Sequence, residues 1–349
     1  MAKKPYNVGV IGYGWAATAH IPAINACEGA QVTAIYSSRP LDAAALSAEY
    51  GSEINVYNDV KALLRDDSID VVDVTSYPYQ HKDQAVAAAK AGKHLIIEKP
   101  VALSLKDVYA IQKAVKKADV QACVCFEVHY ASQFLATKAV IQKGLLGKIH
   151  YGEIDYYHGV GPWYGQYRWN TKKEAGGSSL LSAGCHALDI LRFLMDGEVD
   201  SVMAYQTQSG HKYFKKYEYP TTSVTIMKFA DGRVGKTASV LDCFQPYYFH
   251  THLVGSKGSL LDNKIHSEDL ALDKGQWSEL SMKMVDSGDV ADHPYQTEFE
   301  AFFGNLRKGK PVPGTNLAEA VKSHELIFSG DHNIQNRIIY HIFENSTTL

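Results

Sequence analysis

The chain has 349 residues, of which 46% are hydrophobic and 21% charged, and its formal net charge is −3. This length is enough for two domains with separate cores, and the lack of positive charge argues against a nucleic-acid-binding protein. No apolar run approaches the roughly 20 residues of a membrane span, and the five scattered cysteines indicate reduced thiols in a cytoplasmic protein.

Short apolar runs alternate with helical patterns up to residue 126. The runs at 7–12, 32–36, 70–74, 94–98 and 121–126 are nearly continuous, which is typical of strands buried on both faces of a parallel sheet. Ala-rich segments with helical spacing separate them, and several end in glycine, a helix stop signal. The pattern predicts a doubly wound Rossmann sheet in a domain spanning residues 1–126.

The pattern changes from residue 127 onward. Longer segments of alternating hydrophobicity, parted by Gly or Asp-Gly turns, predict an open and mostly antiparallel sheet. A strong helical pattern over 178–195 interrupts these segments, and two more helical patterns follow residue 294. Residues 127–349 are therefore predicted to form an α+β domain.

The first predicted strand leads directly into GYGWAA at 12–17, a GxGxxA sequence before a helical pattern. In such a loop Gly12 makes the tight turn, Gly14 lets the backbone approach a pyrophosphate, and Ala17 lets the helix pack on the strand. The positive end of the helix then faces the phosphate charge. The context predicts a dinucleotide site, although the same sequence could be a purely structural turn.

The residues after the second predicted strand bear on the choice of cofactor. An Asp or Glu at this position would bind the ribose 2′-hydroxyl of NAD, but the chain has Ser37, Ser38 and Arg39. Two hydroxyls and a guanidinium suit a 2′-phosphate better, which favours NADP over NAD. If Arg39 stacks on the adenine instead, the choice stays open.

Four stretches carry a resemblance to a known family. They are GYGWAA at 12–17, AGKHLIIEKPVALS at 91–104, KGLLGKI at 143–149 and AGGSSLLSAGCHALDILRFL at 175–194. On these stretches the chain resembles, over nearly its whole length, the glucose–fructose oxidoreductase and inositol dehydrogenase (Gfo/Idh/MocA) family. The resemblance implies an NAD(P)-dependent oxidoreductase of sugars, polyols or related cyclic alcohols. It also implies a Rossmann domain and a substrate domain whose open sheet commonly forms a homo-oligomer, here a dimer or tetramer.

In this context the sequence Glu98-Lys99-Pro100 marks the catalytic end of a strand. Lys99 leaves the carboxyl end of a parallel strand, where ligands of such sheets bind, and a cis bond before Pro100 is common in the family. Next to a nicotinamide, its ammonium would hydrogen-bond the reacting oxygen and stabilise the charge that develops there. Glu98 is expected to orient its neighbours or contact the nicotinamide ribose. The simpler alternative is a surface ion pair between Glu98 and Lys99.

The family's D-x-x-x-H-x-x-D pattern is matched in part. His186 and Asp189 fit the pattern, whereas Ser182 occupies the position of its first Asp. His186 is expected to act as general acid or base because its ordinary pKa lies near neutrality, and Asp189 to orient it or hold a substrate hydroxyl. Ser182 can form a hydrogen bond but cannot be a base at neutral pH. The alternative for His186 is a structural histidine.

The remaining candidates follow from the resemblance and from residue type. Further cofactor contacts are Trp15, Ala16, Ser76 and His81, and further substrate contacts are Glu127, His129, Tyr157, Trp163, Arg168 and Trp169. Aromatic rings stack on sugars and arginine binds hydroxyls or carboxylates, although the loop that holds Trp163, Arg168 and Trp169 could equally be a packing flap or a subunit contact.

A metal is not expected. His250 and His252 share a strand face as metal ligands can, but no third ligand is evident at a useful spacing. The predicted partners are therefore a nucleotide and a small sugar-like substrate, without nucleic acid or membrane. Two alternatives to a dehydrogenase stay open. One is a redox-neutral glycosidase or lyase that uses tightly bound NAD(H) through a transient keto-sugar, and the other is a non-catalytic nucleotide-binding protein.

Overall fold

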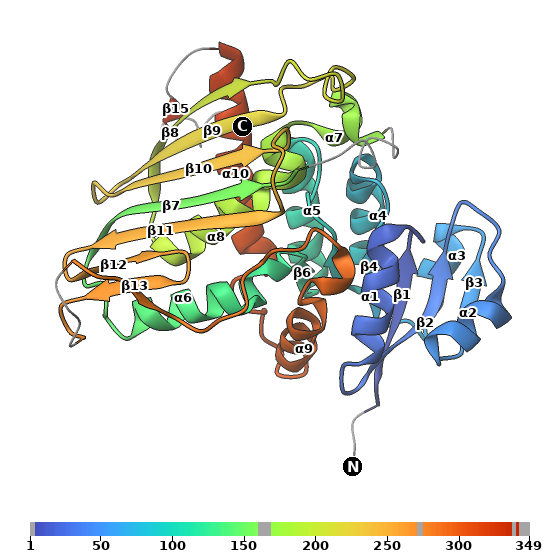
Figure 1. Ribbon diagram of the computed structural model, residues 1–349. Helices are drawn as coiled ribbons and strands as arrows, with labels where there is room; N and C mark the ends of the chain where they lie inside the picture. Colours follow the sequence, from blue (N-terminus) through green and yellow to red (C-terminus); the bar gives the residue numbers. More distant parts are fainter. Residues whose placement is uncertain (1–3, 160–168, 271–274, 337–339, 342–349) are drawn as a thin grey trace. The chain divides into compact units, whose positions relative to one another are not determined.

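The computed structural model describes residues 4–159, 169–270, 275–336 and 340–341 (Figure 1). The chain forms two compact units, the first made of Met1–Glu127 with Asp289–Lys322 and the second of Val128–Gly288 with Ser323–Leu349. The first unit thus includes a late segment, 289–322, that the sequence analysis assigned to the second domain.

The first unit is built on a six-stranded parallel sheet with strand order β3-β2-β1-β4-β5-β6. Its strands are β1 (Tyr6–Ile11), β2 (Ala30–Tyr36), β3 (Asn55–Tyr57), β4 (Val71–Val74), β5 (His94–Ile97) and β6 (Ala122–Val124). From Val8 in β1, throughout β4 and from Leu95 in β5, the side chains are buried on both faces, as the continuous apolar runs predict. The predicted doubly wound Rossmann sheet is confirmed.

Helices connect these strands. They are α1 (Trp15–Asn25), α2 (Ala43–Tyr50), α3 (Val60–Leu64), α4 (Pro78–Lys90) and α5 (Leu105–Ala118). Asp42, Asp59 and Ser104 cap three of them by accepting hydrogen bonds from main-chain amides of the first turn.

The segment 289–322 completes the first unit with η5 (Val290–Asp292) and α9 (Tyr295–Leu306). Helix α9 packs against α1, and Phe299, Phe302 and Phe303 are buried in the same core as Val8 and Ile21. Burial of these aromatic rings explains why the segment belongs to this unit. Helical spacing along the chain shows that a helix has an apolar face but not which core that face joins.

The second unit is built on a nine-stranded sheet with strand order β14-β13-β12-β11-β7-β10-β9-β8-β15. Its strands are β7 (Ile149–Tyr157), β8 (Val199–Thr207), β9 (Thr222–Phe229), β10 (Val234–Val240), β11 (Tyr248–Gly255), β12 (Gly258–Leu261), β13 (Lys264–Ser267), β14 (Ser278–Glu279) and β15 (Tyr340–His341). All neighbouring strands are antiparallel except β7 and β10, which run parallel. The predicted, mostly antiparallel sheet is confirmed.

One face of this sheet is covered by helix. The other elements of the unit are η1 (Glu127–Tyr130, which begins on the last residue of the first unit), α6 (Ser132–Gln142), η3 (Trp169–Thr171), α7 (Lys173–Gly176), η4 (Leu180–Gly184), α8 (Cys185–Met195) and α10 (Leu317–Asn336, which begins in the first unit). Helix α8 lies so close to β7 that a Cβ on Gly152 would collide with Met195 and Leu191 (Figure 1). Because strand side chains alternate, the odd-numbered residues of β7 lie on the other face. We call that other face the open face.

Two further predictions from the sequence concern the cysteines, expected as reduced thiols, and membrane spans, of which none was expected. All five cysteines are free thiols, and four of them are buried. Within the described ranges, no helix has both the length and the apolar character that crossing a membrane would require.

Candidate active site

The loop between β1 and α1 has the backbone that a dinucleotide needs. Gly12 has a φ of +106°, and a Cβ there would lie 2.8 Å from the backbone of Ser76, so only glycine fits. No atom lies within 4 Å of the place where a Cβ of Gly14 would be, which leaves room above the loop. Helix α1 then begins at Trp15, whose side chain is 41% exposed, with no side chain capping its first amides. These features fit a pyrophosphate bound by main-chain N–H groups of residues 14–16.

The end of β2 lies beside this loop. Arg39 donates a hydrogen bond of 2.7 Å from its guanidinium to the carbonyl of Tyr13, and its main-chain N–H donates to the Ser37 hydroxyl at 3.1 Å. Ser37 is buried, whereas Ser38 and Arg39 are exposed. The guanidinium is thus held next to the glycine loop.

Ser76 and His81 form polar contacts that stabilise the loops after β4 and β5. The Ser76 hydroxyl donates to Gln84 at 2.5 Å, and the buried ring of His81 lies 2.9 Å from the carbonyl of Pro100 and 3.0 Å from that of Ser76. Burial lowers the pKa of His81, and this effect outweighs the two carbonyl contacts, which raise it. These contacts give His81 a supporting role at the sheet edge, while a direct cofactor contact stays a prediction.

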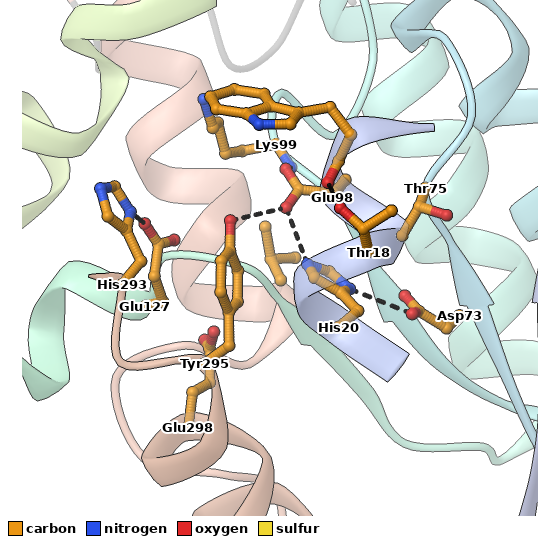
Figure 2. Close-up of polar contacts among 12 residues, drawn as sticks. Thr18, His20, Asp73, Thr75, Glu98, Lys99, Glu127, His293, Tyr295 and Glu298 are labelled. Carbon is orange, nitrogen blue, oxygen red and sulfur yellow. Dashed lines mark hydrogen bonds and ion pairs between the residues drawn. The ribbon is translucent and has the colours of Figure 1, made fainter. Parts of the chain in front are cut away.

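Glu98 lies at the centre of a buried polar network at the carboxyl end of β5 (Figure 2). Its Oε1 lies 3.0 Å from Nε2 of His20 and accepts a hydrogen bond of 3.1 Å from the Tyr295 hydroxyl. Its Oε2 accepts the main-chain N–H of Lys99 at 2.9 Å. The other ring nitrogen of His20 lies 3.0 Å from Asp73. A chain of side chains from β4, α1 and α9 therefore fixes the carboxylate that precedes Lys99.

The charges of this network follow from its geometry. Burial lowers the pKa of His20, but the neighbouring Asp73 and Glu98 carboxylates outweigh it and raise that pKa to about 10. Burial raises the pKa of Glu98, but the hydrogen bond and charge of His20, with the charge of Lys99, bring it below its ordinary value. An imidazolium thus bridges two carboxyl groups. Glu98 is only 6% exposed, so a simple surface ion pair with Lys99 does not describe it.

Glu127 belongs to a second buried pair of the same unit. Its Oε1 lies 2.7 Å from Nδ1 of His293, and Glu127 is 1% exposed (Figure 2). Nearby on α9, Glu298 is fully buried, and burial raises its pKa well above the ordinary value. Glu127 is thus engaged inside the first unit, and its contact with a substrate stays a prediction.

The sequence analysis missed His20, Asp73, His293 and Tyr295. One signal was available, because Asp73 interrupts an otherwise apolar strand, and a buried carboxylate requires a partner. Nothing in the sequence indicated that this partner would be His20, or that His293 and Tyr295 would come from a segment almost 200 residues further on.

Asp189 forms a corresponding network in the second unit. Its two oxygens contact Nε2 of His129 and the hydroxyl of Ser323, and Arg192 lies 3.8 Å away. Burial raises the pKa of Asp189, but the His129 charge and hydrogen bond bring it below the ordinary value. Asp189 is fully buried and holds His129 in place, and its expected role towards His186 or a substrate hydroxyl stays a prediction.

His186 lies in the first turn of α8 and is 3% exposed. The turn before it, η4, has π-helical geometry and contains Ser182, whose hydroxyl donates to the carbonyl of Ser178 at 2.8 Å. Such turns occur frequently at functional sites. Lys99 lies in the first unit and His186 in the second, and their convergence on one substrate carbon stays a prediction.

The structure separates the other substrate candidates. Tyr157 lies on the open face of the sheet, where its ring stacks on Tyr248, whereas α8 with His186 packs on the opposite face. Strand alternation thus puts Tyr157 on the face opposite to the one that α8 covers, and its contact with a substrate stays a prediction. Trp169 begins η3 and is half-buried. Trp163 and Arg168 lie outside the described residues.

Comparison with known proteins gives the same family for both units. Residues 6–126 match the model of an oxidoreductase family with an NAD-binding Rossmann fold, and residues 134–261 match the GFO/IDH/MocA C-terminal domain. Myo-inositol 2-dehydrogenase of Thermotoga maritima is 26% identical over 305 residues, which are 87% of this chain and 89% of that protein. Levoglucosan dehydrogenase of Pseudarthrobacter phenanthrenivorans is 28% identical over 324 residues, with 83% and 81% covered.

A solved structure shows the same fold. Levoglucosan dehydrogenase in complex with NADH and levoglucosan superimposes with a TM-score of 0.83 at 21% identity and covers 97% of this chain and 100% of that one. Two matching domain models, in the order in which the two sheets occur along the chain, confirm the resemblance drawn from the sequence. This chain belongs to the Gfo/Idh/MocA family of oxidoreductases with an NAD-binding Rossmann fold.

Proposed function

We propose that the chain is a dehydrogenase or reductase that transfers hydride between a nicotinamide cofactor and a secondary alcohol or ketone carbon of a sugar, polyol or related cyclic compound. The observation that carries this proposal is the fixed position of Glu98 and Lys99 at the carboxyl edge of the same parallel sheet that bears the glycine loop. Ligands of such sheets bind where the strand order reverses, which here is between β1 and β4.

Lys99 is the proposed catalytic residue of the first unit. The cofactor, when bound, supplies or accepts the hydride. The ammonium of Lys99 would hydrogen-bond the reacting oxygen and stabilise negative charge on it. Glu98, anchored by His20 and Tyr295, holds the main chain of Lys99 and keeps negative charge beside its ammonium.

His186 is the proposed proton relay, supplied by the second unit. Its place in the first turn of α8, directly after a π-helical turn, supports this role. Ser182 then serves as a hydrogen-bonding group for a substrate hydroxyl, since it cannot carry charge. Arg168, Trp163 and Trp169 remain candidates for the sugar-binding wall.

NADP is the proposed cofactor. Residues 36–40 contain no carboxylate that could bind the 2′-hydroxyl of NAD, and the Arg39 guanidinium is held beside the glycine loop. A 2′-phosphate near Arg39 would gain a charge-assisted hydrogen bond that NAD cannot form.

A homo-oligomer that uses the β8 and β9 part of the open face of the nine-stranded sheet is also proposed. Tyr205 is 69% exposed and Ile226 is 43% exposed, and the strand register places both on that face. Large apolar side chains that remain exposed on a sheet support association with another copy. Sedimentation analysis of the wild type and of Tyr205→Glu with Ile226→Glu tests this.

The test of function is turnover with a panel of polyols, inositols and anhydrosugars, followed by absorbance of the reduced nicotinamide with NAD and with NADP. Net absorbance change with at least one secondary alcohol is expected. Conversion of glycosides without net absorbance change would instead establish the redox-neutral alternative. Cofactor binding without any conversion across the panel would favour the non-catalytic alternative.

A further inference from the structure

A second cluster of ionisable side chains lies on the open face, around neighbouring strands β7 and β11. The strand register sets His252 opposite Glu153 and His250 opposite Asp155. One potential ligand atom from each of Glu153, His250 and His252 lies within 4.8 Å of the other two. The carboxylate that the sequence analysis did not find beside the two histidines is therefore supplied by the adjacent strand.

His250 has a carboxylate next to one of its ring nitrogens, as metal-binding histidines commonly do. Its Nδ1 lies 3.1 Å from Oδ1 of Asp262, which leaves Nε2 for another partner. Asp262 is itself held by the Tyr248 hydroxyl at 2.5 Å and by the main-chain N–H of Thr251 at 2.9 Å. Metal-binding histidines commonly donate their second N–H to a carboxylate, which fixes the ring orientation.

The other two side chains can complete such a site. The described contacts of His252 are ring contacts with Tyr151 and His250, so its ring is oriented by packing. Glu153 accepts hydrogen bonds from Lys236 at 2.5 Å and from Tyr151 at 2.8 Å. A carboxylate has about four acceptor positions, so these two bonds leave capacity for a metal ion.

The charge of the cluster favours a cation. Glu153 and Asp155 share the ammonium of Lys236, which lies 2.5 Å from Glu153 and 2.7 Å from Asp155, whereas Asp262 lies 3.1 Å from Nδ1 of His250. Negative charge is therefore in excess when both imidazoles are neutral. Lys236 can keep its pairing with Asp155 if Glu153 turns towards a metal.

We propose that Glu153, His250 and His252 form a site for a divalent transition-metal ion, Zn²⁺ in particular, on the open face of the second unit. Two imidazole nitrogens and one carboxylate oxygen are ligands that suit Zn²⁺ and leave its fourth position for water. Zinc bonds of about 2.0–2.1 Å require ligand atoms roughly 3.3 Å apart, and the present ligand atoms lie within 4.8 Å of one another. A bound ion would tie β7 to β11.

The experiment is calorimetric titration of the full-length, EDTA-treated protein with ZnCl₂ alone. One saturable Zn²⁺ site per chain is expected. His252→Ala and Glu153→Gln should each weaken binding at least about tenfold, and Asp262→Asn about tenfold because the orientation of His250 is lost. Lys236→Met should bind Zn²⁺ at least as tightly as wild type, since the competing ammonium is removed. Titration with Co²⁺ should give the visible absorption bands of a four-coordinate site.

The control is His150→Ala. His150 lies on the same strand β7, is exposed, and has the opposite alternation from Glu153, so its loss should leave Zn²⁺ binding unchanged. Circular dichroism shows that each variant is folded. Absence of saturable binding by the wild type would overturn the proposal, and so would equal affinities of wild type, His252→Ala and Glu153→Gln, which would place the metal elsewhere on the chain.

Discussion

Two clusters of carboxylates, one in each unit, combine the same kinds of side chain in different surroundings. In the first unit the Glu98 side chain is 9% exposed and is held by an imidazolium and a tyrosine hydroxyl. In the second unit the Glu153 side chain is 19% exposed and is held by an ammonium and a tyrosine hydroxyl. The difference in solvent access decides what each cluster can do.

A buried charge cannot exchange its partner for water. Removal of one member of a buried ion pair typically costs about 3–5 kcal/mol, whereas exposed pairs contribute about 0–1 kcal/mol. The Glu98 cluster is therefore suited to holding one arrangement beside Lys99. The Glu153 side chain is 19% exposed and that of Lys236 is 24% exposed, so this pair can exchange partners at a lower cost than a fully buried one, which a site for an exchangeable ion requires.

The largest difference in kcat is expected between variants of Lys99 and Lys236. Lys99→Met should lower kcat by a factor on the order of 10² to 10⁴, because the ammonium that stabilises the reacting oxygen is lost. Lys236→Met, the matched change in the other cluster, should leave kcat within about twofold of wild type. Steady-state kinetics measures both, and cofactor fluorescence titration shows whether Lys99→Met still binds nucleotide. Full activity of Lys99→Met would remove Lys99 from the proposed mechanism.

The variants Glu98→Gln and Glu153→Gln should differ in their free energy of unfolding. Glu98→Gln should lower the free energy of unfolding by about 3 kcal/mol, because the His20 imidazolium loses a buried countercharge. Glu153→Gln should lower it by less than about 1 kcal/mol, since water replaces the lost contact. Urea unfolding followed by circular dichroism measures both. Equal losses would mean that burial does not distinguish the clusters.

The pH dependence of stability tests the charge of His20. Its folded-state pKa of about 10 lies above the ordinary value of 6.5, so its stabilising effect is complete below about pH 6.5 and disappears as the pH rises through 10. The wild type should therefore lose more stability than His20→Gln between these limits. The groups that set this behaviour are the Asp73 and Glu98 carboxylates, which lie 3.0 Å from the two ring nitrogens, while Tyr295 packs against the ring. Parallel pH profiles for the two proteins would contradict a protonated His20.

The smallest expected effect concerns cofactor choice. Arg39→Ala should lower the ratio of kcat/KM for NADP to that for NAD by about tenfold, since one charge-assisted hydrogen bond to the 2′-phosphate is lost. Arg39→Lys should retain part of the preference because the positive charge remains. A wild-type enzyme that prefers NAD, with no change in Arg39→Ala, would assign Arg39 to adenine stacking.

The fold of each unit was predictable because its signals are local. Continuous apolar runs identified the parallel strands, alternation identified the antiparallel sheet, and the GxGxxA loop identified the nucleotide end. The placement of α9 in the first unit was not predictable in the same way. Its Phe299 and Phe303 show that the helix is buried, but not that it packs against α1, because that contact joins residues about 280 positions apart.

The same distinction applies to the sites. By itself the sequence determined the family and the two sheets, and it made Lys99 and His186 the candidate catalytic residues, since all of these depend on short stretches of neighbouring residues. Only the tertiary structure decided that His20 and Tyr295 anchor Glu98, that Asp189 serves His129, and that Glu153 joins His250 and His252. Those pairings depend on strand register and on distant segments packing together, and the spacing of residues along a chain does not encode either directly.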